Sequence, residues 1–512
     1  MNTLKDLWDK AASDYADYTA VKWLDKKDIC GKSYKELGDI VNKLSRGLAA
    51  SGFYDSHIAL IGETSIYWIA SYLGIVTGTN TAVPLDANLP VEELTDLLNR
   101  SDSKALFISP KLSVVADAVK QNCPNIKKIW FLEQSSPKET SDRDNIYNLM
   151  GLGTIIKEAP LPKADDVATI IFTSGTTGKS KGVMLTHRNL YDNVQNVDYV
   201  AEPGTSVLSV LPIHHAYCLV MDWLKGFSLG ASLCINDSFM HMIRNMNIFK
   251  PDIMLMVPLM IETIYKKIAA SKGEADPSIF GGNLKIIFTG GAHLEPFYID
   301  KFAPFGIKIL EGYGMSECSP VITTNTLANY KPGSIGKPLP NAELSFEDGE
   351  ILVKGSSVMK GYYKMPEETA KALKDGWLHT GDKGYLDKDG YLFINGRVKN
   401  LIIMSNGENV SPEEIENKLS INPLVSEIII SGENNGLTAT IYPEEELIKM
   451  KGLTKEAVSA SLQTLIDEYN STQPTYRHIT KIVVRDEPFA RNSTGKIKRF
   501  DASNTNVKKQ AV

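Results

Sequence analysis

Short apolar runs alternate with amphipathic helical patterns through the first three quarters of the chain. The runs lack the strict alternation of apolar and polar residues that marks a half-buried strand, so they predict strands buried on both faces, as in parallel sheets covered by helices. Helical patterns follow two of them, at 65–76 and 89–101. We therefore predict an α/β fold. The predicted strands are 58–62, 81–85, 105–109, 206–212, 232–236, 253–258 and 284–291.

The pattern changes from about residue 335. Short apolar stretches are separated there by turn residues every few positions, and the sequence DKDG at 387–390 is typical of a tight hairpin turn before YLFINGR. These features predict a small β-rich subdomain packed on the α/β part.

A separate α+β unit is predicted after Arg397. Its first helix spans 411–420, where Ser411 is the expected N-cap, Pro412 the first helical residue and Glu414 the residue that completes a capping box. A hairpin at 427–442, a helix at 454–470 and a strand at 481–485 follow. The unit spans about 110 residues, which is an ordinary domain size.

The bulk properties narrow the class of protein. A chain of 512 residues is too long to fold around a single hydrophobic core, so more than one domain is expected. The net charge of −6, with no block of like charges, argues against nucleic-acid binding. The five cysteines are scattered, form no C-x-x-C pair and are odd in number, which favours a reducing cytoplasm. The apolar segment 58–76 contains Glu63 and is interpreted as strand and helix, so no transmembrane segment is expected. Peripheral contact with a membrane stays open.

One stretch, TIIFTSGTTGKSKGV at 169–183, carries candidate chemistry. An apolar strand opens into a loop of glycines and hydroxyl residues, and Lys179 and Lys181 add positive charge. Such a loop offers backbone N–H groups to an anion. It departs from the usual phosphate-loop pattern because Thr173 stands at the position of the first glycine. Residues alone leave two interpretations open, a phosphate site and a flexible surface loop.

Several further motifs appear in a fixed order and give a resemblance to a known family. After FTSGTTGKSKGVMLTHRNL come LPIHHAY (211–217), FTGGAHL (288–294), GYGMSECSP (312–320), GWLHTGD (376–382), GRVKNLIIMSNGENVSPEEIE (396–416) and NSTGKIKR (492–499). Together they resemble the adenylate-forming superfamily, whose members include acyl-CoA synthetases, adenylation domains of peptide synthetases and beetle luciferases. The closest resemblance is to long-chain fatty acid–CoA ligases.

The resemblance implies an architecture and a reaction. It implies a large N-terminal AMP-binding domain at 1–396, a hinge at 397–400 with Lys399 at the hinge position, and a mobile C-terminal domain at 401–512. In the family, a carboxylate attacks the α-phosphate of ATP and gives acyl-AMP and pyrophosphate. Because two anions must meet, the site has to neutralise charge and hold the reactants in line.

The resemblance also assigns residues to ATP and Mg²⁺. The loop would hold the leaving phosphates, and Thr176 and Glu317 would lie at Mg²⁺, which takes few protein oxygens in nucleotide sites. Gly291, Ala292 and Tyr313 would form the adenine slot, and Asp382 would accept the ribose hydroxyls. The loop residues are Thr173, Ser174, Gly175, Thr176, Thr177, Gly178, Lys179 and Lys181. The other residues implied to bind ATP or AMP are Gly291, Ala292, Gly312, Tyr313, Gly314, Ser316, Asp382 and Arg397.

Three residues are implied in the reaction steps. Lys496 would stabilise the charge that builds up during adenylation, with Ala490 standing where the family commonly has a proline before Arg491. His215 would border the acyl pocket and the reacting carboxylate. Gly407 would approach the acceptor thiol after the C-terminal domain rotates.

The adjacent pair His214 and His215 is also a candidate for a zinc site. Neighbouring side chains on a strand point in different directions, and no third ligand lies at a standard spacing, so zinc is set aside. His214 is then expected to be structural.

The acid and the acceptor are less determined. No aspartate near Ala216 and Tyr217 pairs with a substrate ammonium, which argues against an amino acid. The apolar segments 219–231 and 242–265 are candidates for an acyl tunnel or for ordinary core. We expect an enzyme that joins a medium- or long-chain fatty acid to CoA. Two alternatives remain, loading of an acyl carrier protein and a nucleotide-binding scaffold without turnover.

Overall fold

The computed structural model describes residues 2–132, 144–173, 180–270, 277–404, 408–433, 436–491, 497–499 and 501. The described chain divides into two compact units. The first consists of Met1–Ser345, Leu352–His379 and Gly390–Leu392, and the second of Phe346–Ile351, Thr380–Asp389 and Phe393–Val512. The predicted hinge at 397–400 includes a short 3-10 turn, η7 (Val398–Asn400), and remains a prediction as a hinge.

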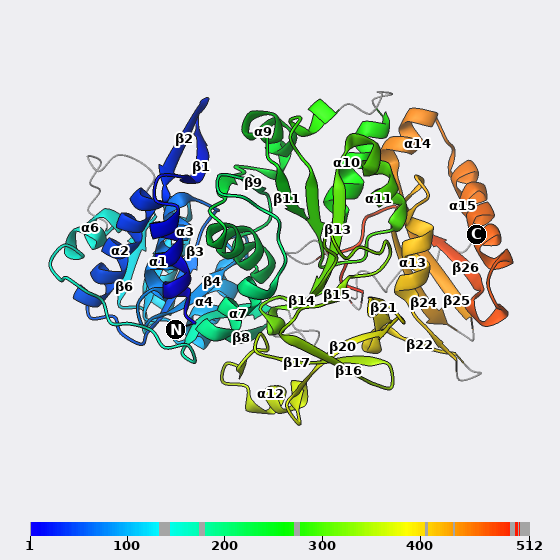
Figure 1. The fold of residues 1–512 in the computed structure, drawn as a ribbon. Coiled ribbons are helices and arrows are strands. Elements are labelled where there is room, and N and C mark those ends of the chain that lie inside the picture. Colours follow the sequence, from blue (N-terminus) through cyan, green and yellow to red (C-terminus); the bar gives the residue numbers. More distant parts are fainter. Residues whose placement is uncertain are drawn as a thin grey trace. The chain divides into compact units, whose positions relative to one another are not determined.

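The first unit contains a nine-stranded sheet in the order β15-β14-β13-β12-β11-β9-β10-β1-β2 (Figure 1). Its middle strands, from β13 to β1, all pair in parallel, and the edge strands β2, β14 and β15 pair antiparallel. The strands are β1 (Thr19–Asp25), β2 (Asp28–Ser33), β9 (Ser206–Ser209), β10 (Ser232–Ile235), β11 (Ile253–Met256), β12 (Ile286–Thr289), β13 (Lys308–Gly314), β14 (Val321–Thr324) and β15 (Lys337–Pro338).

A second sheet of the first unit has seven strands in the order β18-β8-β7-β4-β3-β5-β6. The strands from β7 to β6 are parallel, whereas β7, β8 and β18 pair antiparallel. The parallel, doubly buried strands expected from the apolar runs are therefore confirmed. The strands are β3 (His57–Ile61), β4 (Thr81–Leu85), β5 (Ala105–Ile108), β6 (Lys128–Phe131), β7 (Val167–Thr173), β8 (Lys181–Thr186) and β18 (Gly361–Tyr362).

Helices cover these sheets, and α3 is almost completely enclosed by its neighbours. Ten of its eleven residues are buried, and Gly74 allows α2 to approach, because a Cβ there would come within 2.7 Å of the Leu44 side chain. No described helix is long and apolar enough to cross a bilayer. The helices are α1 (Leu4–Asp14), α2 (Tyr34–Ala50), α3 (Ile66–Val76), α4 (Val91–Arg100), α5 (Ser113–Asn122), α6 (Ile146–Leu152), α7 (His187–Asn196), α8 (Lys225–Ser228), α9 (Met242–Phe249), α10 (Pro258–Ala270), α11 (Pro296–Phe302) and α12 (Pro366–Ala372).

A third sheet, β16-β17-β20-β19 with β21 beside β20, is the expected β-rich region, and the division between the units falls inside its strands. The second unit continues with a three-stranded sheet, β24-β25-β26, whose apolar face packs with α13 and α15 around Leu462 and Ile441. The strands are β16 (Ala342–Glu347), β17 (Glu350–Gly355), β19 (Leu373–Lys374), β20 (Trp377–Leu386), β21 (Leu392–Arg397), β22 (Ile402–Ile403), β23 (Asn409–Val410), β24 (Val425–Glu433), β25 (Gly436–Pro443) and β26 (Ile479–Val484). The helices are α13 (Pro412–Ser420), α14 (Glu445–Lys451) and α15 (Lys455–Ser471).

The capping box predicted for α13 is wrong. Ser411 is the N-cap and Pro412 begins the helix, but the serine side chain makes no capping hydrogen bond. Its hydroxyl donates instead to Glu413, 3.1 Å away. Glu414 forms an ion pair with Arg477 at 3.1 Å. Competing side chains within the folded unit have therefore replaced the local motif.

His187 at the start of α7 links the first helix to the body of the unit. The backbone N–H of Leu4 donates to its Nδ1 over 3.2 Å, and the imidazole is 1% exposed. Burial lowers the pKa of His187 to about 4, although Asp166 and Asp6 act in the opposite direction. The neutral ring is thus the form that the fold requires.

We expect the His187 imidazole to make stability depend on pH. The pKa is about 4 when folded and 6.5 when unfolded, so its contribution is complete above 6.5 and is lost as pH falls toward 4. Between pH 7 and pH 5 the free energy of unfolding should fall by about 2 kcal/mol more in the wild type than in His187→Asn, measured by urea unfolding at each pH. Parallel pH profiles for the two proteins would contradict this.

Candidate active site

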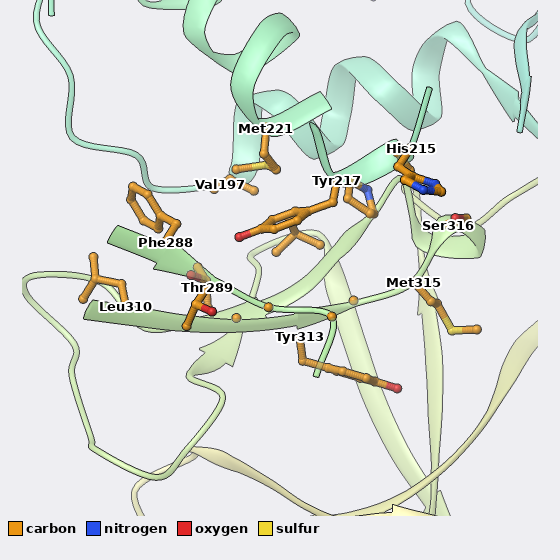
Figure 2. A pocket seen from close by; sticks show the side chains of 18 residues that line it. Val197, His215, Tyr217, Met221, Phe288, Thr289, Leu310, Tyr313, Met315 and Ser316 are labelled. Carbon is orange, nitrogen blue, oxygen red and sulfur yellow. The ribbon is translucent and has the colours of Figure 1, made fainter. Parts of the chain in front are cut away.

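A cavity of about 190 Å³ opens where the parallel strands β12 and β13 end (Figure 2). Carboxyl ends of adjacent parallel strands are the usual place for ligands in α/β sheets. The backbone of Gly290, Gly291 and the Gly312–Gly314 segment forms one side, and the other comes from the segment after β9. The lining residues are Val197, His215, Ala216, Tyr217, Met221, Phe288, Thr289, Gly290, Gly291, Leu310, Gly312, Tyr313, Gly314, Met315, Ser316, Pro320, Val321 and Thr324.

Two of the three residues predicted to form the adenine slot, Gly291 and Tyr313, line this cavity, whereas Ala292 does not. Gly312, Gly314 and Ser316, which were also predicted to bind ATP or AMP, line it as well. Gly291 has a φ of +82°, which a side chain would disfavour. The ring of Tyr313 lies on the other side of the strand backbone from that of Tyr217 (Figure 2).

His215 lines the cavity, and His214 does not. The two residues lie in a turn after β9 ends at Ser209, and their ring centroids are 4.2 Å apart. The expectation that they point in different directions on a strand is therefore wrong, because the strand ends before they begin. His214 lies 3.7 Å from the carboxylate of Asp86, and burial lowers its pKa to about 3. A neutral, buried ring at this place agrees with a structural role for His214.

The segment 217–224 after the histidines is a π-helix, η2 (Tyr217–Leu224), which carries Tyr217 and Met221 to the cavity. The same helix carries the carboxyl of Asp222, whose environment no sequence motif indicated. Asp222 is fully buried and accepts a hydrogen bond from Ser209 over 2.9 Å. Burial raises the pKa of Asp222 to about 7. Of the methionines in 219–231 and 242–265, Met221 alone lines the cavity, so the rest are core or surface of the described chain.

Glu311 is another buried carboxyl that the sequence analysis missed. Glu311 lies on β13 between Leu310 and Gly312, which line the cavity, but it does not line the cavity itself. Burial raises its pKa to about 7, with His293 acting in the opposite direction. Its position next to the Gly312–Gly314 segment is the one sequence signal that points to it.

Glu317 follows the cavity segment in a 3-10 turn, η6 (Ser316–Cys318), and is 9% exposed. The hydroxyl of Tyr362 donates to its Oε1 over 2.8 Å. Within the described residues, the second carboxylate oxygen has no hydrogen-bond partner. Burial, and then the charge of Glu317, raises the pKa of the Tyr362 hydroxyl well above its usual range, which keeps this donor protonated.

The two ends of the glycine-rich loop are held together by the β7–β8 hairpin, in which Thr173 pairs with Lys181. Lys181 forms a close ion pair with Glu368 on α12, and its ammonium lies 4.9 Å above the ring of Tyr362. Lys181 is therefore tied to the tyrosine that contacts Glu317. The remaining predicted loop residues lie outside the described residues. They are Ser174, Gly175, Thr176, Thr177, Gly178 and Lys179.

In the second unit, Arg397 donates from Nε to the carboxylate of Asp382 over 2.8 Å. The carboxylate is 7% exposed, whereas the arginine side chain is 49% exposed. The backbone N–H of Asp382 is held by the Thr380 hydroxyl at 3.1 Å. The structure thus brings together two residues that were assigned separately to the nucleotide.

The segments that flank Lys496 are fixed, although Lys496 and Gly407 themselves lie outside the described residues. Arg491 bonds to Glu427 over 2.7 Å, and the N–H of Lys498 donates to the carbonyl of Ala490 over 2.9 Å. Arg499 is held by Glu416. These contacts hold both flanking segments in place with Ala490 at the position where the family commonly has a proline.

No cluster of three metal-ligating side chains exists among the described residues. That excludes a preformed protein cage there, but not a magnesium ion carried by a nucleotide, which needs only one or two carboxylates. Glu317 offers such a carboxylate, buried and with one oxygen already oriented by Tyr362. The donor set thus fits Mg²⁺ bound to phosphates.

Comparison with known proteins places this geometry in context. The AMP-binding enzyme family matches residues 8–363, and the AMP-binding enzyme C-terminal domain matches residues 399–507. A long-chain-fatty-acid–CoA ligase of Bacillus subtilis (strain 168) is 30% identical over 473 residues, which cover 84% of this chain and 82% of the relative. A chloroplastic long-chain-fatty-acid–[acyl-carrier-protein] ligase of Arabidopsis thaliana, AEE15, is 26% identical over 94% of this chain and 82% of the relative.

Solved structures share the fold. The anthranilate CoA ligase AuaEII in complex with anthranoyl-AMP has a TM-score of 0.85 at 20% identity, covering 98% of this chain and 97% of its own. ATP-bound MatB from Rhodopseudomonas palustris has a TM-score of 0.81 at 24% identity, covering 98% of each chain. At these identities the likeness establishes the fold alone.

Proposed function

This chain belongs to the AMP-binding enzyme family, and from that premise we propose that it converts a carboxylic acid and ATP to acyl-AMP and pyrophosphate and then transfers the acyl group to the thiol of CoA. The acid is a medium- or long-chain fatty acid, in keeping with the relatives named long-chain-fatty-acid–CoA ligase. The enzyme is thus an AMP-forming acid–thiol ligase.

The observation that carries the proposal is the shared cavity of His215 and the segments after β12 and β13. One end is polar, with His215 and Ser316, and the other is apolar, with Val197, Met221 and Phe288 (Figure 2). A fatty acid has the same asymmetry, a carboxylate on an apolar chain. The reacting carboxylate would lie at the His215 end, beside the glycine backbone that leaves room for the adenylate.

Each part of the nucleotide has its own set of proposed contacts. The loop 173–181 holds the leaving pyrophosphate, and Tyr313 with the flanking glycines holds the adenine. Asp382 accepts from the ribose hydroxyls, with Arg397 holding its carboxylate, which is an acceptor-only group suited to a diol. Lys496 supplies a positive charge during adenylation.

Mg²⁺ would be held by Glu317, with Thr176 as the second proposed ligand. When bound, the ion neutralises phosphate charge and so favours pyrophosphate as a leaving group. The protein's own contribution is the Tyr362 hydroxyl, which orients the Glu317 carboxylate.

The acceptor is proposed to be CoA. An acyl carrier protein remains the second candidate, because the relative AEE15 is named an acyl-carrier-protein ligase. The first half-reaction is the same for both acceptors.

The experiment offers CoA and a holo acyl carrier protein in parallel, with ATP, Mg²⁺ and octanoate or palmitate, and detects the thioester by mass spectrometry. We expect acyl-CoA. Acylation of the carrier protein alone would overturn the CoA assignment but not adenylation. Thioester formation with neither acceptor would count against the proposed ligase function.

A further inference from the structure

The cavity is small for the long-chain acids named in the relatives. Its volume is about 190 Å³, and a protein cavity of roughly 150 Å³ accommodates one benzene ring. At the same volume per carbon atom, the cavity of this protein holds roughly eight carbon atoms. Part of its wall is the glycine backbone assigned to the nucleotide, so the acyl group has at most this space.

Tyr217 limits the length of the cavity. Its ring lies across the space between His215 and Phe288, with the hydroxyl directed toward Phe288 (Figure 2). A Cβ built on Gly290 would be 3.8 Å from the Tyr217 ring, so the ring is already in contact range of the strand end. The ring therefore occupies the path that an extended chain would follow from the polar end.

The wall behind Tyr217 is unsuitable for a hydrocarbon chain. Asp222 is fully buried, and its Oδ1 has no hydrogen-bond partner in the described structure. Tyr199, stacked on Phe288 with centroids 4.7 Å apart, also has a buried hydroxyl without a partner there. Both side chains are buried and neither lines the cavity, so a longer alkyl chain would have to displace them.

We infer that Tyr217 is the specificity-determining residue that closes the acyl site and restricts the enzyme to acids of medium chain length. The inference rests on the proposed adenylation at this cavity and narrows its substrate class. Met221 and Val197 form the sides of the same closed end. Chains longer than about eight carbons would require the tyrosine ring to leave its place.

The test compares kcat/KM for hexanoate, octanoate, dodecanoate and palmitate in the wild type, Tyr217→Phe and Tyr217→Ala. Met260→Ala is the matched control, since Met260 belongs to the second methionine-rich segment and does not line the cavity. In the wild type we expect octanoate to be favoured over palmitate by about tenfold or more. Tyr217→Ala should reduce that ratio at least tenfold, whereas Tyr217→Phe and Met260→Ala should retain it.

Two results would overturn the inference. One is a wild type that uses palmitate as well as octanoate, which needs no variant to fold. The other is a ratio of octanoate to palmitate kcat/KM that Tyr217→Ala leaves unchanged, provided that this variant still exchanges pyrophosphate with hexanoate. If no acid supports exchange even in the wild type, adenylation itself fails, so the two failures are distinguishable.

Discussion

Replacement of Glu317 by glutamine is expected to slow acyl-adenylate formation by about 100-fold or more. The substitution keeps the shape of the side chain and the hydrogen bond from Tyr362, but it removes the buried negative charge that we assign to Mg²⁺. Single-turnover formation of octanoyl-AMP at saturating ATP measures the effect. The Mg²⁺ concentration that gives half of the maximal adenylation rate should also be higher than in the wild type.

Two further variants make this result specific. Tyr362→Phe leaves the carboxylate in place but removes its donor, so the loss should be smaller, about tenfold, and the Mg²⁺ requirement should again rise. Glu367→Gln, an exposed position on α12, should behave as the wild type. A Glu317→Gln protein with normal adenylation would show that this carboxylate is not part of the site.

Replacement of Lys496 by alanine is expected to reduce adenylation by about 100- to 1,000-fold, because a charge that acts only while the transition state forms is lost. The transfer from preformed acyl-AMP to CoA should change by only a few fold. Stopped reactions started from acid and ATP, or from synthetic octanoyl-AMP and CoA, separate the two steps.

Lys498→Ala is the control for Lys496, since Lys498 is a neighbouring lysine whose described role is a backbone hydrogen bond to Ala490. It should retain both half-reactions. An equal loss of both half-reactions in Lys496→Ala would indicate a general structural role for the lysine, and the assignment to adenylation would then be withdrawn.

Much of the fold follows from local sequence. The run TAVPL predicts a strand at 81–85, and β4 has these bounds. The GENNG turn predicts the hairpin of β24 and β25, which pair antiparallel. These elements were predictable because a short apolar run bounded by strong turn residues is compatible with few local structures other than a strand.

What depends on distant residues could not be predicted. The order of the strands, with β1 beside β10, is set by segments some two hundred residues apart. The capping box at Ser411 was lost to Glu413 and to the ion pair between Glu414 and Arg477. The environment of Asp222 depends on tertiary contacts, among them the hydrogen bond from Ser209. Such contacts have no periodicity that a single sequence reveals.

The candidate site shows the same division. Motifs identified Tyr313 and Glu317 because each stands in a distinctive stretch of residues. They gave no indication that Tyr362 orients Glu317 or that Lys181 is paired with Glu368, since these partners lie in a segment with no motif of its own.

Acid-dependent exchange of labelled pyrophosphate into ATP is the measurement that tests the central claim most directly, because it reports reversible acyl-adenylate formation without any acceptor. With Mg²⁺ and octanoate, and without CoA, the wild type should incorporate label into ATP, and the Lys496→Ala protein should lose about 99% or more of that rate. If no carboxylic acid in the series from hexanoate to palmitate supports exchange by the wild type, the protein does not form acyl adenylates from fatty acids, and the account is contradicted.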